Sequence, residues 1–566
     1  MRGHHAWRMR HAGARRTLLS AAAVVLLGAI LIPTANAGAS TPKVKNPICS
    51  HLGQLGVSAG AHVYCHGPFK PFRPSRVSAG HRLHPASSAP ANVDAASTAE
   101  DVAPSGVRGY GQSEESVAAV GKYVVEAWND STSFSANCGA PEFKEELTGY
   151  GFSADGGKTF RDEGGLPNAA CSSGWFFQGD PSVEGLTRGG KTYFYVSSLY
   201  VNFNTGQSDI ALDACQVTGS GTGAVLSCNL EPTIVATGAS GDFLDKDYLS
   251  IDPRRGRLYA TFSRFSFPSA SNGQIELAAC DISGARAANP ICFPGSFNSP
   301  YYVVQSANPN CENEGAYSAV NTTNGDVYVA WEFNWATNLF TTACFGVPTR
   351  ERLAYVPNSC LDLSATSPCT SPAPVRASVK IVSMDSALIP GYNRFPMNDF
   401  PRIAVSPKAG TVTIVFNDAS KPTGKILMQS YDLLSSSSTS FTKVQSHPVQ
   451  LNNNKGPTWV FMPGLRNANS SGQLDVIWFD RRKSNPSCEA CTDVFAAMHV
   501  SPTATMTPTA NVRITNVTSN WNAQSSDIVP NFGDYTDDFV AGPLLYAAWA
   551  DGRIGEPQPF SAHTAG

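Results

Sequence analysis

Polar side chains recur at the start of short apolar segments along the chain, and their chemical types could bind or transform a ligand. They are Asp180, Asp245, Asp247, Tyr248, Glu314, Tyr317, Asp399, Arg402, Asp534 and Tyr535. If these segments occupy equivalent places in a repeated fold, the side chains converge on one opening although they lie far apart in sequence. Convergent polar groups in a concave site are the first hypothesis for a binding site.

Three chemical uses of this set are open, beside a structural one. Carboxylates, with Asp245, Asp247 and Asp534 as candidates, could hold Ca²⁺, which takes six to eight oxygen ligands; no other cofactor is expected. Carboxylates that lie close together raise one another's pKa and can supply a general acid. A tyrosine beside an acid, such as Tyr535 beside Asp534, could be an activated phenol. Alternatively, the acids accept hydrogen bonds from turn amides, as Asx turns do.

An internal repeat supplies the elements that would position these residues. Each copy has a polar start, an apolar strand, a Gly or Asn turn, and a second strand that ends in an aromatic residue. The seven copies are 116–130, 179–198, 245–262, 314–331, 399–418, 458–480 and 533–551. Their closing aromatic residues are Trp128, Phe194, Phe262, Trp331, Phe416, Trp478 and Trp549.

A repeat of roughly 70 residues, built from a hairpin and further strands, predicts a β-propeller. A β-sandwich has no reason to repeat at this interval, and one turn of a β-helix is much shorter. We therefore expect an all-β propeller of six or seven blades. Seven blades follow if the chain start supplies the outer strands of the last repeat, and six follow if the two end repeats share one blade.

The first residues are predicted to be an export signal. A basic leader, an apolar core over 18–32 and the small-residue pattern at Ala35-Asn36-Ala37 are typical of a signal peptide over 1–37; an N-terminal membrane anchor is the alternative. Residues 38–105 are expected to form a linker or a small cysteine-clipped segment, and residues 106–566 the propeller. No second long apolar run follows, which predicts no membrane span in the mature, secreted chain.

Composition and cysteine usage limit the partners. The net charge is −3 and the charged residues are scattered, which argues against nucleic-acid binding. All fourteen cysteines follow residue 37 and suit local disulfides in an oxidising compartment. The expected neighbour pairs are Cys49/Cys65, Cys138/Cys171, Cys215/Cys228, Cys280/Cys292, Cys311/Cys344, Cys360/Cys369 and Cys488/Cys491. The last pair could instead be a redox or metal pair, although no partner ligands stand nearby.

One motif and several phrases carry a resemblance to a known family. Residues 153–160 (SADGGKTF) match the Asp-box, a tight turn between two strands found in sialidases and related BNR-repeat propellers. The phrases at 245–252, 478–482, 533–535 and 549–553 resemble secreted bacterial sialidase-like proteins. The chain thus resembles the sialidase superfamily over 106–566. In that family the Asp-box is structural, so we assign it no chemistry.

The resemblance implies a glycoside hydrolase with three arginines that grip a substrate carboxylate, a Tyr–Glu nucleophile pair and an acidic Asp. The family's early Arg-Ile-Pro motif is absent. Chain order alone makes Asp180, Glu314, Tyr535 and Arg402 the catalytic candidates. The substrate-binding candidates are Arg108, Arg466, Tyr248 and Tyr317. The ligand implied is a glycan or glycoconjugate, and two functions stay open, an exo-sialidase-type hydrolase and a non-catalytic propeller that binds a glycan, a protein or a cell-wall polymer.

Two further patterns are expected to be structural. The pairs Asp480/Arg482 and Asp551/Arg553 could contact glycans, but more often such pairs lock neighbouring blades by salt bridges. The closing tryptophans are expected in the core between blades, not as platforms for sugars. A Ser-His-Asp triad finds no support, because no Gly-x-Ser-x-Gly elbow is present in the propeller region 106–566.

Overall fold

The computed structural model describes most of the chain beyond the leader. Described are residues 45–52, 57–66, 88–99, 101–102, 108–132, 146–268, 270–292, 301–308, 311–335, 347–361, 375–384, 387–395, 397–420, 424–435 and 437–565. The predicted signal peptide over 1–37 lies outside these residues. In the part of the chain described, we find no helix with the length and apolar character needed to cross a membrane.

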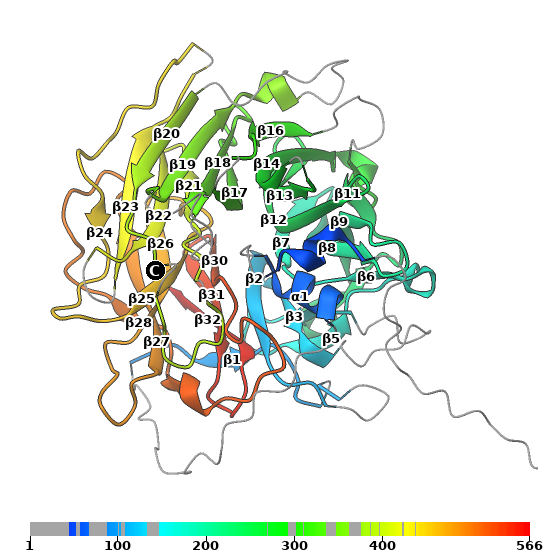
Figure 1. Ribbon diagram of the computed structural model, residues 1–566, viewed down its shortest axis with the longest axis horizontal. Helices are drawn as coiled ribbons and strands as arrows, with labels where there is room; N and C mark the ends of the chain where they lie inside the picture. The colour runs from blue at the N-terminus through cyan, green and yellow to red at the C-terminus, as the bar shows by residue number, and fades with distance from the viewer. Residues whose placement is uncertain are drawn as a thin grey trace, which may run out of the picture. The chain divides into compact units, whose positions relative to one another are not determined.

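Seven antiparallel sheets form the blades of a β-propeller, as the repeat predicts (Figure 1). The first three contain, in chain order, β2 (Gln112–Val120), β3 (Tyr123–Asp130), β4 (Thr148–Ser153) and β5 (Arg161–Gly165); β6 (Trp175–Phe177), β7 (Ser182–Arg188), β8 (Lys191–Asn202), β9 (Ser208–Thr218), β10 (Val225–Cys228) and β11 (Thr233–Thr237); and β12 (Asp242–Asp252), β13 (Arg257–Ser266), β14 (Ala270–Asp281), β15 (Ile291–Cys292) and β16 (Tyr302–Gln305).

The next three blades follow the same plan. They contain β17 (Glu312–Val320), β18 (Val327–Trp335), β19 (Arg350–Val356) and β20 (Val375–Lys380); β21 (Arg402–Ser406), β22 (Thr411–Asp418), β23 (Lys425–Asp432) and β24 (Val449–Gln450); and β25 (Val460–Gly464), β26 (Leu474–Asp480), β27 (Cys491–Val500), β28 (Val512–Arg513) and β29 (Ser519–Asn520).

The last blade joins the two ends of the propeller. It consists of β30 (Asp537–Ala541), β31 (Leu544–Asp551), β32 (Gln558–Ala565) and, as its fourth strand, β1 (Asn92–Asp94). Strand β1 pairs with β32 in the register Val93 to Ser561, so the chain start supplies the missing outer strand and the blade count is seven. The blade also packs on the first one, because β30 and β31 contact β2.

A separate apolar cluster fills the gap between each pair of neighbouring blades. The closing aromatic residue of every repeat lies on the second strand of its blade and is at most 1% exposed. Trp331, Trp478 and Trp549 each belong to one of the clusters between blades, and Trp128 is fully buried. Aromatic side chains that bury about 150–250 Å² each contribute much of such a core. The predicted core role of the tryptophans is therefore confirmed.

Local staples and turns follow the sequence predictions where the structure describes them. Four disulfides join Cys49–Cys65, Cys215–Cys228, Cys280–Cys292 and Cys488–Cys491, so the last pair is a staple. Each of the other three predicted pairs has one cysteine outside the described residues.

The Asp-box forms the turn between β4 and β5. Asp155 accepts hydrogen bonds from the amides of Lys158 and Thr159 at 3.1 and 3.0 Å. Gly157 has a φ of +80°, which a glycine adopts without strain. The box is a structural turn, as expected.

The two aromatic-Asp-Arg endings are also structural. Arg482 forms a two-pronged ion pair with Asp480 and bonds to Asn453 and Asn454 in the connection from the preceding blade. Arg553 pairs with Asp551 at 2.6 Å and donates to Asn516 and Asn92. These arginines thus tie neighbouring segments together at the ends of β26 and β31.

Candidate functional site

The innermost strands of several blades carry an irregular backbone where they enter the central channel. The pairing of inner strand with second strand shifts register after Ser113 in β2, Asp245 in β12, Glu314 in β17 and Phe461 in β25. A residue of positive φ sits at each shift or just before β7: Glu114, Asp180, Lys246, Gly315 and Met462. Bulges of this kind re-aim side chains and often adjoin functional sites. Left-handed backbone at non-glycine residues costs about 1–3 kcal/mol each and needs support from its surroundings.

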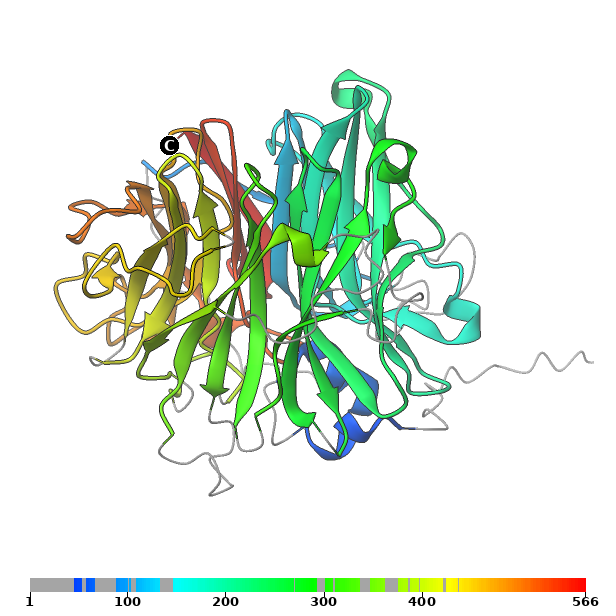
Figure 2. The same cartoon turned by 90° about the horizontal axis from the view of Figure 1, so that it is seen from above.

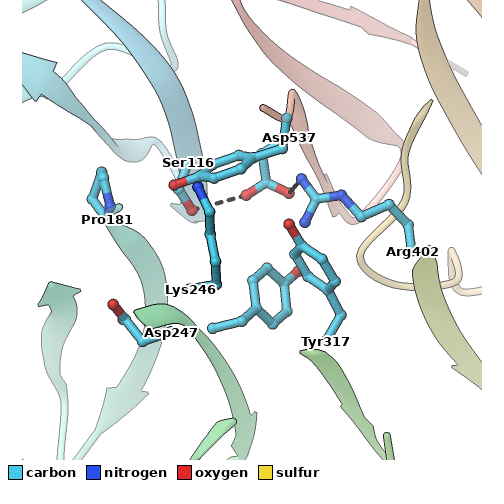
Figure 3. Close-up of a pocket in the computed structure, with 9 residues that line it drawn as sticks. Ser116, Pro181, Lys246, Asp247, Tyr317, Arg402 and Asp537 are labelled. Carbon is cyan, nitrogen blue, oxygen red and sulfur yellow. Dashed lines mark hydrogen bonds and ion pairs between the residues drawn. The ribbon is translucent and has the colours of Figure 1, made fainter. Parts of the chain in front are cut away.

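The residue two positions after three of these sites points toward the axis of the propeller. These residues are Ser116, Tyr248 and Tyr317, and the first residues of β21 and β30, Arg402 and Asp537, join them. Together with Pro181, Lys246, Asp247 and Tyr535 they line one cavity (Figure 3). The space within it is about 10 Å³, room for about one water molecule. We call it the entry cavity, because it lies where the inner strands enter the channel.

Lys246 is the electrostatic centre of this cavity wall. Its ammonium lies 2.9 Å from Asp534, 3.0 Å from Asp180 and 3.4 Å from Glu114. Burial alone would lower the pKa of Lys246, but the three carboxylates outweigh it and raise that pKa well above its usual value. The ammonium therefore stays charged and ties its own blade to three others through buried ion pairs.

The surrounding carboxylates differ in proton affinity. Burial raises the pKa of Asp180 to about 6, with Lys246 opposing the rise, and burial raises the pKa of Asp247 to about 8. Asp534 is also buried, but Arg394 and Lys246 more than offset this and lower its pKa. Asp180 thus exchanges its proton near neutral pH beside a permanently charged Asp534, a combination that general acid–base chemistry can use.

Arg402 and Asp537 form the floor of the entry cavity, and Arg466 pairs with Asp537 from behind it. Arg466 lies 2.7 Å from Asp537 and 3.0 Å from the Ser116 hydroxyl. Arg402 lies 3.7 Å from the other oxygen of Asp537 and donates to the backbone carbonyls of Pro463 and Thr536. An internal carboxylate therefore occupies the position between the two guanidinium groups. Beyond this floor a second hollow of about 330 Å³ opens toward the other end of the inner strands.

Three phenol groups complete the wall. The Arg402 guanidinium lies 4.1 Å from the ring centre of Tyr317 and 5.5 Å from that of Tyr535, and Arg466 lies 4.6 Å from that of Tyr248. Burial raises the pKa of all three tyrosines above the usual value, so the phenols are neutral. Their hydroxyl groups form no hydrogen bond with any residue that the structure describes, so they can bond to a ligand.

Most of the residues selected from the sequence are brought together here. Asp247, Tyr248, Tyr317, Arg402 and Tyr535 line the entry cavity, while Asp180, Asp534 and Arg466 contact residues of its wall or floor. Asp399 instead accepts hydrogen bonds from Asn417 and from the amide of Met384, as a structural acid would.

Two selected residues lie elsewhere. Arg108 is not beside Arg402 and Arg466; it pairs with Glu556 and, at 3.8 Å, with Asp101, and its side chain is 34% exposed. Glu314 is fully buried opposite Glu332 in the ladder between β17 and β18 and does not line the entry cavity. Two of the three expected arginines, Arg402 and Arg466, therefore converge, and both already interact with Asp537. The expected pair of Tyr535 and Glu314 does not form in the cavity.

The three metal candidates face different partners. Asp245 accepts a hydrogen bond from the Ser58 amide at 2.9 Å, Asp247 accepts one from the Ser197 hydroxyl, and Asp534 pairs with Lys246. Among the described side chains, no three His, Cys, Asp or Glu residues are grouped as metal ligands. An ammonium occupies the place among carboxylates where the sequence suggested a cation.

The sequence analysis missed the charged residues that tie the site together. Lys246 stands inside the phrase Asp245-Lys246-Asp247, but only its acidic neighbours were selected. Asp537 was missed because only Asp534 and Tyr535 were selected from the start of the last repeat, and Asp537 stands two residues further on. The useful signal is positional: at three of the bulges, the residue two places after the site of positive φ lines the cavity.

Comparison with known proteins gives likenesses of low similarity. No protein-family model matches the chain, and no curated protein matches it by sequence. Among solved structures, it is similar to the α-L-arabinofuranosidase of Fusarium graminearum with arabinobiose (11% identity, TM-score 0.41, 84% of this chain and 97% of that one). It is also similar to the α-L-arabinanase of Penicillium chrysogenum complexed with arabinobiose (10%, 0.37, 88% and 98%) and to Trypanosoma rangeli sialidase (10%, 0.36, 86% and 59%). The assignment as a propeller rests on the strand pairing described above.

Proposed function

We propose that the protein is a secreted propeller that binds a glycan at the entry cavity. The observation that carries this proposal is the set of three neutral phenol hydroxyls beside Arg402, all turned to one cavity at the propeller axis. Such groups donate to and accept from the hydroxyl groups of a sugar, and aromatic walls pack on its apolar face. The cavity has room for about one water molecule as it stands, so a sugar enters only if part of its wall moves.

The floor favours a neutral sugar over a sialic acid. A substrate carboxylate would have to displace Asp537 from Arg466 and Arg402, and separating a buried ion pair costs several kcal/mol. The disulfides suit an oxidising compartment, which fits a protein that meets glycans outside the cell.

Binding is tested with the purified protein against a panel of neutral and sialylated glycans by calorimetry. Replacement of one phenol hydroxyl, Tyr317→Phe or Tyr248→Phe, should weaken binding about 3- to 10-fold, the value of one hydrogen bond. Tyr123→Phe, on the half-buried edge of β3, is the matched control and should change nothing. Binding that survives both cavity variants unchanged would refute the site.

Hydrolysis is a second candidate, favoured by one observation. Asp180, with a pKa near 6, pairs with Lys246 in the wall that Tyr535 also lines. We therefore include fluorogenic sialosides and arabinosides, with and without Ca²⁺. If turnover occurs, Tyr535→Phe and Asp180→Asn should each abolish it; full activity of either variant removes that residue from the mechanism.

A further inference from the structure

A small disulfide-closed segment lies on the face of the propeller where the inner strands enter. It comprises residues 45–52 and 57–66, contains η1 (Pro47–Ser50) and α1 (Ala59–His66), and is closed by Cys49–Cys65. We call it the N-terminal clip. Figure 2 shows it in blue on one face of the blades. Its apolar side packs on the second and third blades, against Val201, Phe243 and Phe265.

The clip is anchored by specific polar contacts as well as by apolar packing. The side-chain amide of Asn46 donates hydrogen bonds to the backbone carbonyls of Gly206 and Asp242 at 2.9 and 2.6 Å. The ring of His51 stacks on Phe267 with centroids 4.5 Å apart. These contacts fix the clip at the junction of the second and third blades, directly beside the channel.

The inner edge of the clip reaches the charged wall of the entry cavity. The buried Ser58 amide donates to Asp245 at 2.9 Å, one residue before Lys246. His62 interacts electrostatically with Lys246, Arg394 and Asp534. Asp245, Lys246 and Asp534 are at most 4% exposed, and Arg394 in the segment 387–395 also pairs with Asp534. The clip covers these charged residues beside the cavity without lining it, and with the clip docked the entry cavity has room for only about one water molecule.

We propose that the N-terminal clip is a cap on the entry cavity, and that it undocks from the second and third blades to admit the ligand. This inference rests on the proposed binding site. Its own disulfide lets the clip keep its shape when it undocks, because Cys49 and Cys65 join the clip to itself and not to a blade. Elements that open over binding sites belong to the less stable parts of a fold.

One glycine offers a way to release the clip without changing the cavity. A Cβ atom added at Gly60 would lie 1.8 Å from the backbone carbonyl oxygen of Gln178, which cannot move aside. Gly60→Ala also favours the helix itself, so the clip should stay folded while its docking weakens. Gly60→Phe enlarges the overlap. Gly223→Ala is the matched control, since an added Cβ there meets no atom within 4 Å.

Two readouts separate clip release from ligand binding. Hydrogen exchange at the Ser58 amide reports release, and nitration of Tyr317 and Tyr535 by tetranitromethane, mapped by peptide mass spectrometry, reports access to the entry cavity. We expect Gly60→Ala to increase both by about 10- to 100-fold, the usual effect of overpacking. Gly223→Ala should leave both as in the unmodified protein.

The outcomes are distinct. If neither Gly60 variant releases the clip, or if release leaves both tyrosines unreactive, the clip is a fixed part of the propeller and the inference is overturned. If the tyrosines become reactive and glycan binding strengthens, the inference stands. If they become reactive and no glycan of the panel binds, the cap stands and the proposed function fails.

Discussion

Acid should release the N-terminal clip through His62. In the docked clip, burial lowers the pKa of His62 from 6.5 to about 4, and the positive charges of Arg394, His66 and Lys246 act in the same direction, while Asp534 opposes them. The docked state therefore binds fewer protons than the released state. Docking keeps its full strength above pH 6.5 and loses it as the pH falls toward 4.

The size of the effect follows from the two pKa values. At about 1.36 kcal/mol for each pKa unit, the shift of His62 from 6.5 to about 4 corresponds to about 3 kcal/mol once the pH is below 4. At pH 5 the released population should be about 30-fold larger, relative to the docked one, than at pH 8. A change of this size moves a rarely open cap into the measurable range.

The assay is hydrogen exchange at the Ser58 amide between pH 8 and 5, corrected for the intrinsic pH dependence of exchange. His62→Gln keeps a polar side chain that cannot be protonated, so its corrected profile should lose the increase in exchange toward pH 5 and keep only the part due to Asp245, whose pKa burial raises to about 6. Tyrosine nitration in the entry cavity is not used here, because that reagent itself depends on pH. Identical profiles for the unmodified protein and His62→Gln would refute the reasoning, since the protonation of another group would then drive release.

Three further perturbations probe the floor, the clip and the Asp-box. Asp537→Asn removes the carboxylate paired with Arg466 and should lower the free energy of unfolding by about 3–5 kcal/mol, measured by denaturant titration, because it leaves buried charge uncompensated. The double change Cys49→Ser and Cys65→Ser opens a loop of sequence separation 16 and should cost the folded clip about 3 kcal/mol, seen as faster exchange over 57–66 with an unchanged propeller melting transition. Asp155→Ala should cost about 1–2 kcal/mol through lost turn hydrogen bonds and leave ligand affinity unchanged.

Each of these perturbations has a control or a contrary outcome. Asp281→Asn removes an aspartate paired with two partly exposed arginines and should cost at most about 1 kcal/mol; an equal loss for both aspartate variants would remove the special role of the floor. Replacing Cys280 and Cys292 should loosen the third blade and not the clip. A change in ligand affinity in Asp155→Ala would assign the Asp-box a part in binding.

The fold was largely predictable because the residue types that recur in each repeat are those needed for packing between blades. Each second strand needs a large aromatic residue against the next blade, and that requirement recurs in every copy from Trp128 to Trp549. The extra outer strand was also predictable, since the last copy is too short to complete a blade and β1 pairs with β32 to complete it.

The site was predictable only in outline, because its chemistry depends on which blades face one another. Position at a strand entry was enough to select Tyr248, Tyr317 and Arg402. Chain order, by contrast, carried no spatial information for Arg108, which pairs with Glu556 and Asp101 and not with the residues of the floor. The docking of the clip depends on tertiary contacts, such as that between Ser58 and Asp245, which no local sequence pattern predicts.

The pairing of β1 with β32 has a consequence for how the protein is made. Strand β1 is synthesised before the other strands of the propeller, and its partner β32 after them. Blades can assemble one after another on the growing chain, but the ring stays open until β32 has been made. A protein truncated before β32 would lack its latch and expose the unpaired edge of β31 to other chains.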